Sequence, residues 1–281
     1  MTDAVLRSGG RLVEPAEADV VVWLNPRPGG LDGVLHPGVR WVQLPLAGVE
    51  AWIGDPVLTS GPLFTSARGA YAKAVAEHAL ALLLAGSRRL ADAARSTSWN
   101  RPDTRMLAGA GVAIIGAGGI GIDLIRYLAP FDCRITAVNR SGNPVDGADE
   151  TLPVSRLDDA CGRADYFVLA APATPATNAL IGADQLARMS PEAWIVNIAR
   201  GSLIDTAALE TALAAGAIGG AALDVTEPEP LPADHPLWTQ PRCLITSHSA
   251  NPTAARLQAL ADRVAENMAR YARGEQLIGE I

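Results

Sequence analysis

Three side chains suited to binding a carboxylate and transferring a proton each follow a strand-like apolar run: Arg200, Glu229 and His248. Open α/β sheets bind ligands beyond the carboxyl ends of their strands, so these side chains are expected to converge. A planar guanidinium binds a carboxylate through two parallel hydrogen bonds, and an imidazole donates a proton near neutral pH. A carboxylate beside the imidazole stabilises its protonated form. The set is therefore suited to hydride transfer to or from a 2-keto acid, whose carboxylate the guanidinium would hold.

Each member of this triplet also has a structural alternative. Arg200 could form an ion pair at a helix start, and His248 could be a hydrogen-bonded loop histidine. Glu229 could be a solvated loop charge, and it competes with Glu227 for the role of carboxylate partner. The placement of the three residues at successive strand ends of one sheet favours a joint site.

A glycine-rich turn precedes the triplet in the chain. It follows the apolar run Val112–Ile115 and opens a predicted helix over Ile120–Leu128, which is the context that a dinucleotide-binding turn requires. The unpaired N–H groups and the dipole of such a helix favour a pyrophosphate at its N-terminus. The alternative is a turn without a ligand. We expect the turn to bind a dinucleotide through Gly116, Gly118, Gly119, Ile120 and Gly121.

The residue that reads the adenosine ribose is expected at the end of the next strand, about 20 residues after the turn. This position holds Asn139-Arg140-Ser141 and no carboxylate that would bind a ribose 2′-OH or repel a 2′-phosphate. Arg140 could pair with that phosphate, with Asn139 and Ser141 as donors. The sequence therefore favours NADP over NAD, the alternative being a solvated arginine in an enzyme that accepts either cofactor.

Asp224 lies near the end of the predicted strand Gly220–Val225, where a buried carboxylate needs a hydrogen-bond partner. We predict that it accepts a hydrogen bond from the nicotinamide carboxamide, a turn or capping role being the alternative.

Composition bounds the class of protein. The chain has 281 residues, of which 49% are hydrophobic, enough for a sizeable core in one large or two medium domains. Its net charge of −7 gives no basic excess for nucleic acid. The 3 cysteines form no CxxC pair, which suggests neither a metal site nor disulfides and fits a reducing cytoplasm. The longest apolar stretch is too short to span a membrane, and no signal peptide is expected.

The order of apolar runs predicts an α/β protein. Continuous apolar runs alternate with helical patterns, which indicates a doubly wound parallel sheet buried on both faces. Long helices are expected over Ala74–Ser96 and Pro252–Arg273, and a shorter one over Thr206–Ala215. A poorly defined first strand is expected within Ala4–Val13. The clearer strands are predicted at Ala18–Leu24, Val39–Leu44, Gly111–Ile115, Arg134–Val138, Asp165–Ala170, Ala193–Ile198, Gly220–Val225 and Cys243–Thr246.

From about Trp41 onward the chain resembles the D-isomer-specific 2-hydroxyacid dehydrogenase family. Several phrases carry the resemblance besides the glycine-rich turn: Val75–Leu80, Ala164–Asp165, Pro172–Thr177, Asn197–Gly201, Asp205–Leu209, Asp224–Pro230 and Thr246–Ser249. The resemblance implies Arg200 as the substrate-binding residue and His248 as the acid/base. The family's spacing from the strand-end aspartate implies Glu229, not Glu227, as the partner of the histidine.

The resemblance also implies further site residues. The phrase Ala47-Gly48-Val49-Glu50 matches the family's substrate loop, so the amides of Ala47, Gly48 and Val49 would help to hold the substrate carboxylate. His78 is implied to be structural, near the interdomain hinge. The remaining cofactor contacts would come from Ala171, Pro172, Thr177, Ile198, Ala199 and Ala250.

The family's architecture implies two Rossmann-like domains and a homodimer. Residues 1–98 and 252–281 would form a discontinuous substrate-binding domain around a dinucleotide-binding domain at 99–251. The N-terminal segment is shorter than is usual in the family, Gly119 stands where many relatives have Arg, and Ser249–Pro252 replaces a glycine-rich phrase. These departures concern cofactor and substrate preference.

The expected activity is NAD(P)-dependent reduction of a small 2-keto acid such as glyoxylate or hydroxypyruvate, with no metal and no nucleic-acid or membrane partner. One alternative is a phosphoglycerate dehydrogenase-like enzyme, for which Arg68 and Lys73 are the nearby basic residues. The other is a nucleotide-sensing binding protein like the corepressors that share this fold.

Overall fold

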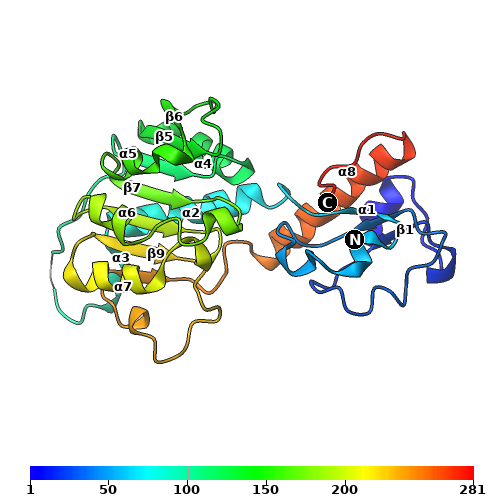
Figure 1. The fold of residues 1–281 in the computed structure, drawn as a ribbon, viewed down its shortest axis with the longest axis horizontal. Coiled ribbons are helices and arrows are strands. Elements are labelled where there is room, and N and C mark those ends of the chain that lie inside the picture. The colour runs from blue at the N-terminus through cyan, green and yellow to red at the C-terminus, as the bar shows by residue number, and fades with distance from the viewer. Residues whose placement is uncertain (100) are drawn as a thin grey trace. The chain divides into compact units, whose positions relative to one another are not determined.

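The computed structural model describes residues 1–99 and 101–281, which form two compact units. The smaller unit combines Met1–Tyr71 with Pro252–Ile281, and the larger unit comprises Ala72–Asn251. The larger unit is therefore inserted into a smaller unit that is discontinuous in sequence (Figure 1). Both units contain a parallel sheet, which confirms the predicted α/β class.

The larger unit is built on a sheet in the order β10-β9-β8-β7-β4-β5-β6, with every neighbouring pair parallel. The order reverses between β4 and β7, and this is the switch point where ligands bind in open α/β sheets. The strands are β4 (Gly111–Ile115), β5 (Arg134–Asn139), β6 (Glu150–Pro153), β7 (Tyr166–Leu169), β8 (Trp194–Asn197), β9 (Gly220–Leu223) and β10 (Cys243–Ile245).

Helices cover both faces of this sheet. On one face α2 packs against α4 and over β8 and β9, and on the other α6 contacts both α5 and α7 (Figure 1). The central strands are accordingly buried along their whole length, which explains their continuous apolar runs. The helices are α2 (Ala72–Ser87), α3 (Leu90–Arg95), α4 (Gly119–Leu128), α5 (Leu157–Cys161), α6 (Ala183–Arg188) and α7 (Thr206–Ala215).

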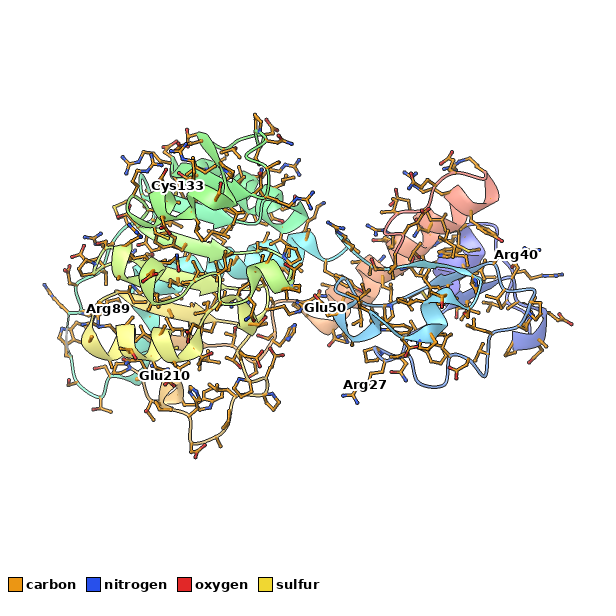
Figure 2. The ribbon with its side chains drawn as sticks, viewed as in Figure 1. Arg27, Arg40, Glu50, Arg89, Cys133 and Glu210 are labelled. Atoms are coloured by element: carbon orange, nitrogen blue, oxygen red, sulfur yellow. The ribbon has the colours of Figure 1, made fainter. Side chains whose placement is uncertain are left out.

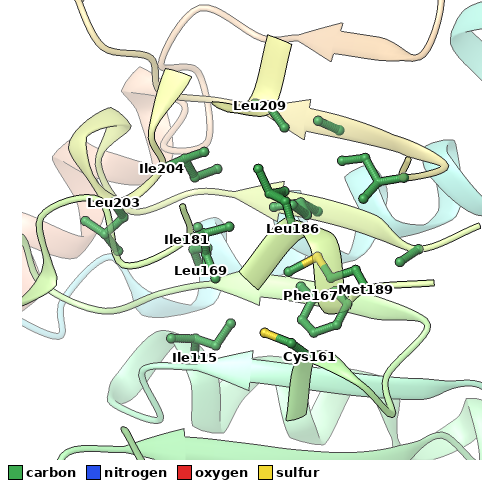
Figure 3. Packing of buried hydrophobic residues seen from close by; sticks show 14 of the residues in the cluster. Ile115, Cys161, Phe167, Leu169, Ile181, Leu186, Met189, Leu203, Ile204 and Leu209 are labelled. Atoms are coloured by element: carbon green, nitrogen blue, oxygen red, sulfur yellow. The ribbon is translucent and has the colours of Figure 1, made fainter. Parts of the chain in front are cut away.

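One part of the core of the larger unit lies between the sheet and helices α5 to α7. Figure 3 shows Phe167 and Leu169 of β7 among Cys161 of α5 and Leu186 of α6, and all four side chains are buried. Full burial of one leucine or phenylalanine side chain stabilises the folded state by about 1.5–3 kcal/mol. This packing fixes the sheet and hence the loops beyond the ends of its strands.

The smaller unit has a three-stranded parallel sheet in the order β1-β2-β3 among the described residues. The tryptophans Trp41 and Trp52 of this unit are fully buried. Charged side chains such as Arg27 and Arg40 lie exposed on its surface (Figure 2). Its elements are α1 (Thr2–Arg7), β1 (Val20–Val22), β2 (Trp41–Gln43), β3 (Leu63–Thr65) and α8 (Thr253–Ala272).

The predicted first strand within Ala4–Val13 is wrong, because this region holds the helix α1. Asp3 lies in its first turn and Arg7 in its last, where these charges complement the helix dipole. The short apolar run between them lacks a periodicity that would separate strand from helix. Within the described residues, no helix is long and apolar enough to cross a membrane.

The long helix predicted over Ala74–Ser96 is two helices, α2 and α3, separated at Arg89 with φ +50°. Gly86 lies just before the break, and a side chain there would contact the Trp194 ring. Because α2 packs against the larger sheet, residues 72–98 lie with the larger unit, whereas the sequence placed them with the N-terminal part. The functional names of the two units stay predictions.

A buried polar network joins α8 to the small sheet. The fully buried Asn267 side chain donates hydrogen bonds to Gln43 Oε1 and Ile278 O, both at 3.0 Å, and accepts one from Ile278 N at 2.8 Å. Gln43 Oε1 also accepts a hydrogen bond from Thr65 Oγ1 at 3.0 Å. The amphipathic helix is therefore held by directional contacts as well as by its apolar face.

Asn267→Ala should lower the free energy of unfolding by about 3 kcal/mol, because buried polar groups left unpaired cost about 1–3 kcal/mol each. Urea denaturation followed by tryptophan fluorescence measures the change. Gln258→Ala, on the exposed side of the same helix, is the control and should change stability by less than about 0.5 kcal/mol. An Asn267→Ala protein as stable as the unmutated chain would contradict a stabilising role for the network.

Candidate active site

The glycine-rich turn joins β4 to α4 at the switch point of the sheet, and its glycines meet different surroundings. Gly116 has φ +98°, and a Cβ there would collide with the backbone of Ala170 and Ala171 at the end of β7. A Cβ on Gly121 would lie 2.7 Å from Gly116 O, so this glycine allows the helix to pack against the turn. Gly118, the N-cap residue of α4, has no atom within 4 Å of an added Cβ.

This pattern leaves open space in front of the N-terminus of α4. The tight turn and the close helix packing use Gly116 and Gly121, while the space at Gly118 is not filled by protein. Backbone N–H groups at a helix N-terminus attract anions. The turn thus fits the pyrophosphate of a dinucleotide.

Asn139 ends β5 and shapes the next turn. Its Oδ1 accepts hydrogen bonds from the amides of Ser141 at 3.1 Å and Gly142 at 2.6 Å, and its Nδ2 donates to Asn143 O at 2.8 Å. The Asn139 side chain is therefore engaged in forming the turn. Arg140 is exposed at its tip, with no hydrogen bond or ion pair to any residue that the structure describes.

Arg200 follows β8 in a turn built by a buried asparagine. Asn197 Nδ2 donates to Arg200 O at 2.8 Å, and Asn197 Oδ1 accepts from the Ala199 amide at 3.1 Å. The Arg200 guanidinium donates to Ala199 O at 2.7 Å. A Cβ on Gly201 would collide with the backbone of Thr226, so the turns after β8 and β9 lie in direct contact.

Glu229 and His248 meet directly: His248 Nδ1 lies 2.6 Å from Glu229 Oε1. Hydrogen bonds from Thr206 Oγ1 to Glu227 O and from Thr226 Oγ1 to Pro228 O, both 2.8 Å, hold the loop that carries Glu229. The imidazole is 55% exposed and the carboxylate 40%. With Nδ1 facing Glu229, the other ring nitrogen, Nε2, has no hydrogen bond to the residues that the structure describes.

Asp224 lies beneath the His248 loop and is 2% exposed. Its Oδ1 accepts hydrogen bonds from Thr246 Oγ1 at 2.6 Å and the Ser249 amide at 2.8 Å, and its Oδ2 accepts one from the Ala250 amide at 3.1 Å. Burial alone would raise the pKa of this carboxyl, but the hydrogen bonds, led by that from His78, lower it to about 2. Asp224 is therefore a buried anion at neutral pH.

The structure brings Glu229, His248, Asp224 and Ala250 together, and it joins the turn of Arg200 to the loop that carries Glu229. The apolar residues Ile198 and Ala199 are buried at the end of β8. Sequence reasoning missed Thr246 and Ser249 as ligands of Asp224. The signal for Thr246 was present, because its hydroxyl stands two residues before His248. Ser249 donates chiefly through its backbone amide, which no side-chain pattern reveals.

The remaining predicted residues lie after β7, next to the glycine-rich turn, and in the smaller unit. After β7, Thr177 Oγ1 donates to Pro172 O at 2.7 Å and so closes the loop that begins at Ala171. Ala47, Gly48 and Val49 belong to the smaller unit, and in the described part of the chain none of their amides donates a hydrogen bond. Their role in substrate binding stays a prediction.

No group of three His, Cys, Asp or Glu side chains in residues 1–99 and 101–281 could hold a metal ion. Burial raises the pKa of the thiols of Cys161 and Cys243 to about 12, which keeps both protonated at neutral pH.

Comparison with known proteins identifies relatives of the chain. Residues 80–250 match the family model described as "D-isomer specific 2-hydroxyacid dehydrogenase, NAD binding domain". The "Uncharacterized protein in proB 3'region" of Corynebacterium melassecola is 39% identical over 289 residues, covering 100% of this chain and 94% of that protein. The glyoxylate reductase/hydroxypyruvate reductase of Homo sapiens is 34% identical over 215 residues, covering 73% of this chain and 66% of the human protein.

Solved structures share the fold. A D-isomer specific 2-hydroxyacid dehydrogenase from Xanthobacter autotrophicus Py2, in complex with NADPH and MES, superposes with a TM-score of 0.82 at 28% identity. The superposition covers 98% of this chain and 87% of that one.

The glycines of the turn should respond differently to a methyl group. Gly116→Ala should lower the free energy of unfolding by about 2 kcal/mol or more, since it combines a positive φ with a backbone collision. Gly118→Ala should change the free energy of unfolding by less than about 0.5 kcal/mol and yet weaken dinucleotide binding. Urea denaturation and titration with a reduced dinucleotide measure the two effects. Equal destabilisation by both changes would refute the distinction.

Proposed function

Because the chain belongs to the D-isomer specific 2-hydroxyacid dehydrogenase family of NAD(P)-dependent oxidoreductases, we propose that it reduces a small 2-keto acid to the D-2-hydroxy acid, or catalyses the reverse reaction. The observation that carries this proposal is the hydrogen bond of 2.6 Å between His248 Nδ1 and Glu229 Oε1. It gives the imidazole a fixed orientation and a negative partner, which are the two properties that a proton donor to an alkoxide needs.

The proposed roles follow from the chemistry of the side chains. Arg200 holds the substrate carboxylate, since a guanidinium provides two parallel donors. When bound, the nicotinamide supplies the hydride for the keto carbon. His248 gives its Nε2 proton to the developing alkoxide, and Glu229 holds the ring through Nδ1 and stabilises its positive charge before that transfer. In the reverse direction His248 accepts the proton.

The turn at Gly116, Gly118 and Gly121 fits the pyrophosphate of the cofactor, because only the space at Gly118 is left unfilled by protein. Asp224, Ala250 and the loop that begins at Ala171 remain the predicted contacts to the rest of the cofactor. Arg140 supports NADP as the preferred form: it is exposed beyond β5, without a partner among described residues, and no carboxylate stands beside it in the turn.

Glyoxylate and hydroxypyruvate are the proposed substrates, since the human relative carries these activities in its name. The amides of Ala47, Gly48 and Val49, which make no hydrogen bond within the described residues, would assist Arg200 in binding a carboxylate. A homodimer is proposed on the resemblance alone, and size-exclusion chromatography with light scattering tests it.

The test of the function is oxidation of NADPH and NADH by the purified protein with glyoxylate, hydroxypyruvate, pyruvate, 2-ketobutyrate and phosphohydroxypyruvate. His248→Gln should lower kcat about 100-fold to about 10,000-fold through loss of the proton donor, with cofactor affinity retained. His235→Gln is the matched control, since His235 pairs with Glu210 in the same unit. Binding of the cofactor without reduction of any acid would overturn the proposal. Strong preference for phosphohydroxypyruvate would indicate a phosphoglycerate dehydrogenase.

Arg140→Gln should raise the KM for NADPH about tenfold to about 100-fold and leave the KM for NADH nearly unchanged, because a charged hydrogen bond to the 2′-phosphate is lost. Arg134→Gln is the control, since Arg134 is exposed at the opposite end of the same strand. Steady-state kinetics with both cofactors measure the change. An equal rise in the KM for NADPH and NADH, or no rise in either, would contradict the assignment of Arg140 to the 2′-phosphate.

A further inference from the structure

His78 projects from the second turn of α2 toward residues that hold the His248 loop. Its Nε2 lies 3.0 Å from Thr246 Oγ1 and 3.3 Å from Asp224 Oδ1, and its side chain is 22% exposed. The proposed proton transfer uses neither His78 nor Thr246. The contact joins two segments that are 168 residues apart in sequence.

The direction of these hydrogen bonds can be deduced. Thr246 Oγ1 lies 2.6 Å from the carboxylate oxygen Asp224 Oδ1, which can only accept, so the single hydroxyl proton of Thr246 points to Asp224. Thr246 Oγ1 must then accept from His78, and His78 carries its proton on Nε2. The result is a directed chain from His78 through Thr246 to Asp224, in which each hydrogen bond polarises the next. The same Nε2–H group also faces Asp224 Oδ1 directly at 3.3 Å.

The end of this chain determines the backbone of His248. Asp224 O accepts the His248 amide at 2.8 Å, while the Asp224 carboxylate accepts the amides of Ser249 and Ala250. His248 itself has φ +48°, in the left-handed region that few non-glycine residues adopt and that surrounding contacts must stabilise. The loop therefore depends on Asp224 being fixed and charged.

We propose that His78 is a positioning residue for His248: through Thr246 and Asp224 it fixes the strained loop that aims the imidazole. This inference rests on the proposed function of His248 as the proton donor. His78 acts at a distance, because Glu229, and not His78, contacts the catalytic ring.

Helix α2 and the loop around His248 lie at the two ends of the larger unit's sequence. The helix begins at Ala72, the first residue of the larger unit, and the His248 loop ends at Asn251, the last residue of that unit. His78 thus connects α2, the first helix of the larger unit, to the loop around His248. No strand or helix in the described part of that unit follows this loop to hold it in place. Among the partners that lower the pKa of Asp224, His78 has the largest effect.

The test compares two substitutions of His78. His78→Met removes the donor at similar side-chain length, and His78→Gln retains an N–H group near the position of Nε2. His235→Met is the matched control: His235 is also largely buried in the larger unit, but it pairs with Glu210 on α7. All three variants and the unmutated full chain are compared.

The expected kinetic result is a loss of kcat with little change in the KM for the keto acid, since the loop acts in the transition state. His78→Met should lower kcat about tenfold to about 100-fold, because a small misplacement of a catalytic group has effects of that size. His78→Gln should recover kcat to within about threefold, and His235→Met should leave kcat within about twofold. If His78→Met and His235→Met leave kcat equally unaffected, His78 is merely structural and the inference is overturned.

A second readout needs no activity. In the cofactor-free protein, NMR hydrogen exchange at the amides of Ser249 and Ala250 should be faster in His78→Met and close to normal in His78→Gln. Unchanged exchange in His78→Met would overturn the inference. An unmutated chain that reduces no keto acid while these amides still respond to His78 would refute the proposed function and leave the positioning contact standing.

Discussion

The buried carboxylate of Asp224 is the constraint on which the candidate site depends. A charge removed from water must be fully hydrogen-bonded, and here the donors are the hydroxyl of Thr246, the amides of Ser249 and Ala250, and His78. Because three of these donors come from the loop around His248, satisfying the charge also fixes that loop. The geometry of the proposed proton donor is thus a consequence of the electrostatics of the residue beneath it.

Small residues at strand ends allow the loops of the site to approach one another. Gly116 brings the turn after β4 against the end of β7, and Gly201 brings the turn after β8 against Thr226 after β9. Both approaches are backbone to backbone, so no side chain could replace either glycine without moving a loop. The parallel sheet sets which loops are neighbours, and the glycines set how closely they approach. Gly118 is the exception, because no atom lies within 4 Å of a Cβ added there.

The strands and helices that the sequence predicted well are those with one dominant local signal. The strand at β4 and the helix α7 have the predicted bounds, because a continuous apolar run or an alanine-rich segment with an Asp205 cap has one local solution. The first strand was wrong and the helix from Ala74 was too long, because short apolar runs and a left-handed residue at Arg89 leave no clear periodic signal. The boundary near residue 98 differed from the structure for a related reason: α2 belongs to the larger unit through its packing, and packing has no local signature.

The sequence by itself determined the α/β class, the dinucleotide turn and the residue types of the site, because each depends on local patterns and on which side chain stands at a strand end. The family resemblance added the choice of Glu229 over Glu227. Only the tertiary structure decided that Glu229 meets His248 at 2.6 Å and that the Asp224 carboxylate accepts hydrogen bonds from the loop around His248. It also decided that His78 reaches Thr246 from a helix at the start of the same unit. These contacts join segments distant in sequence, and their geometry is set by how the sheet, its helices and a buried charge pack together.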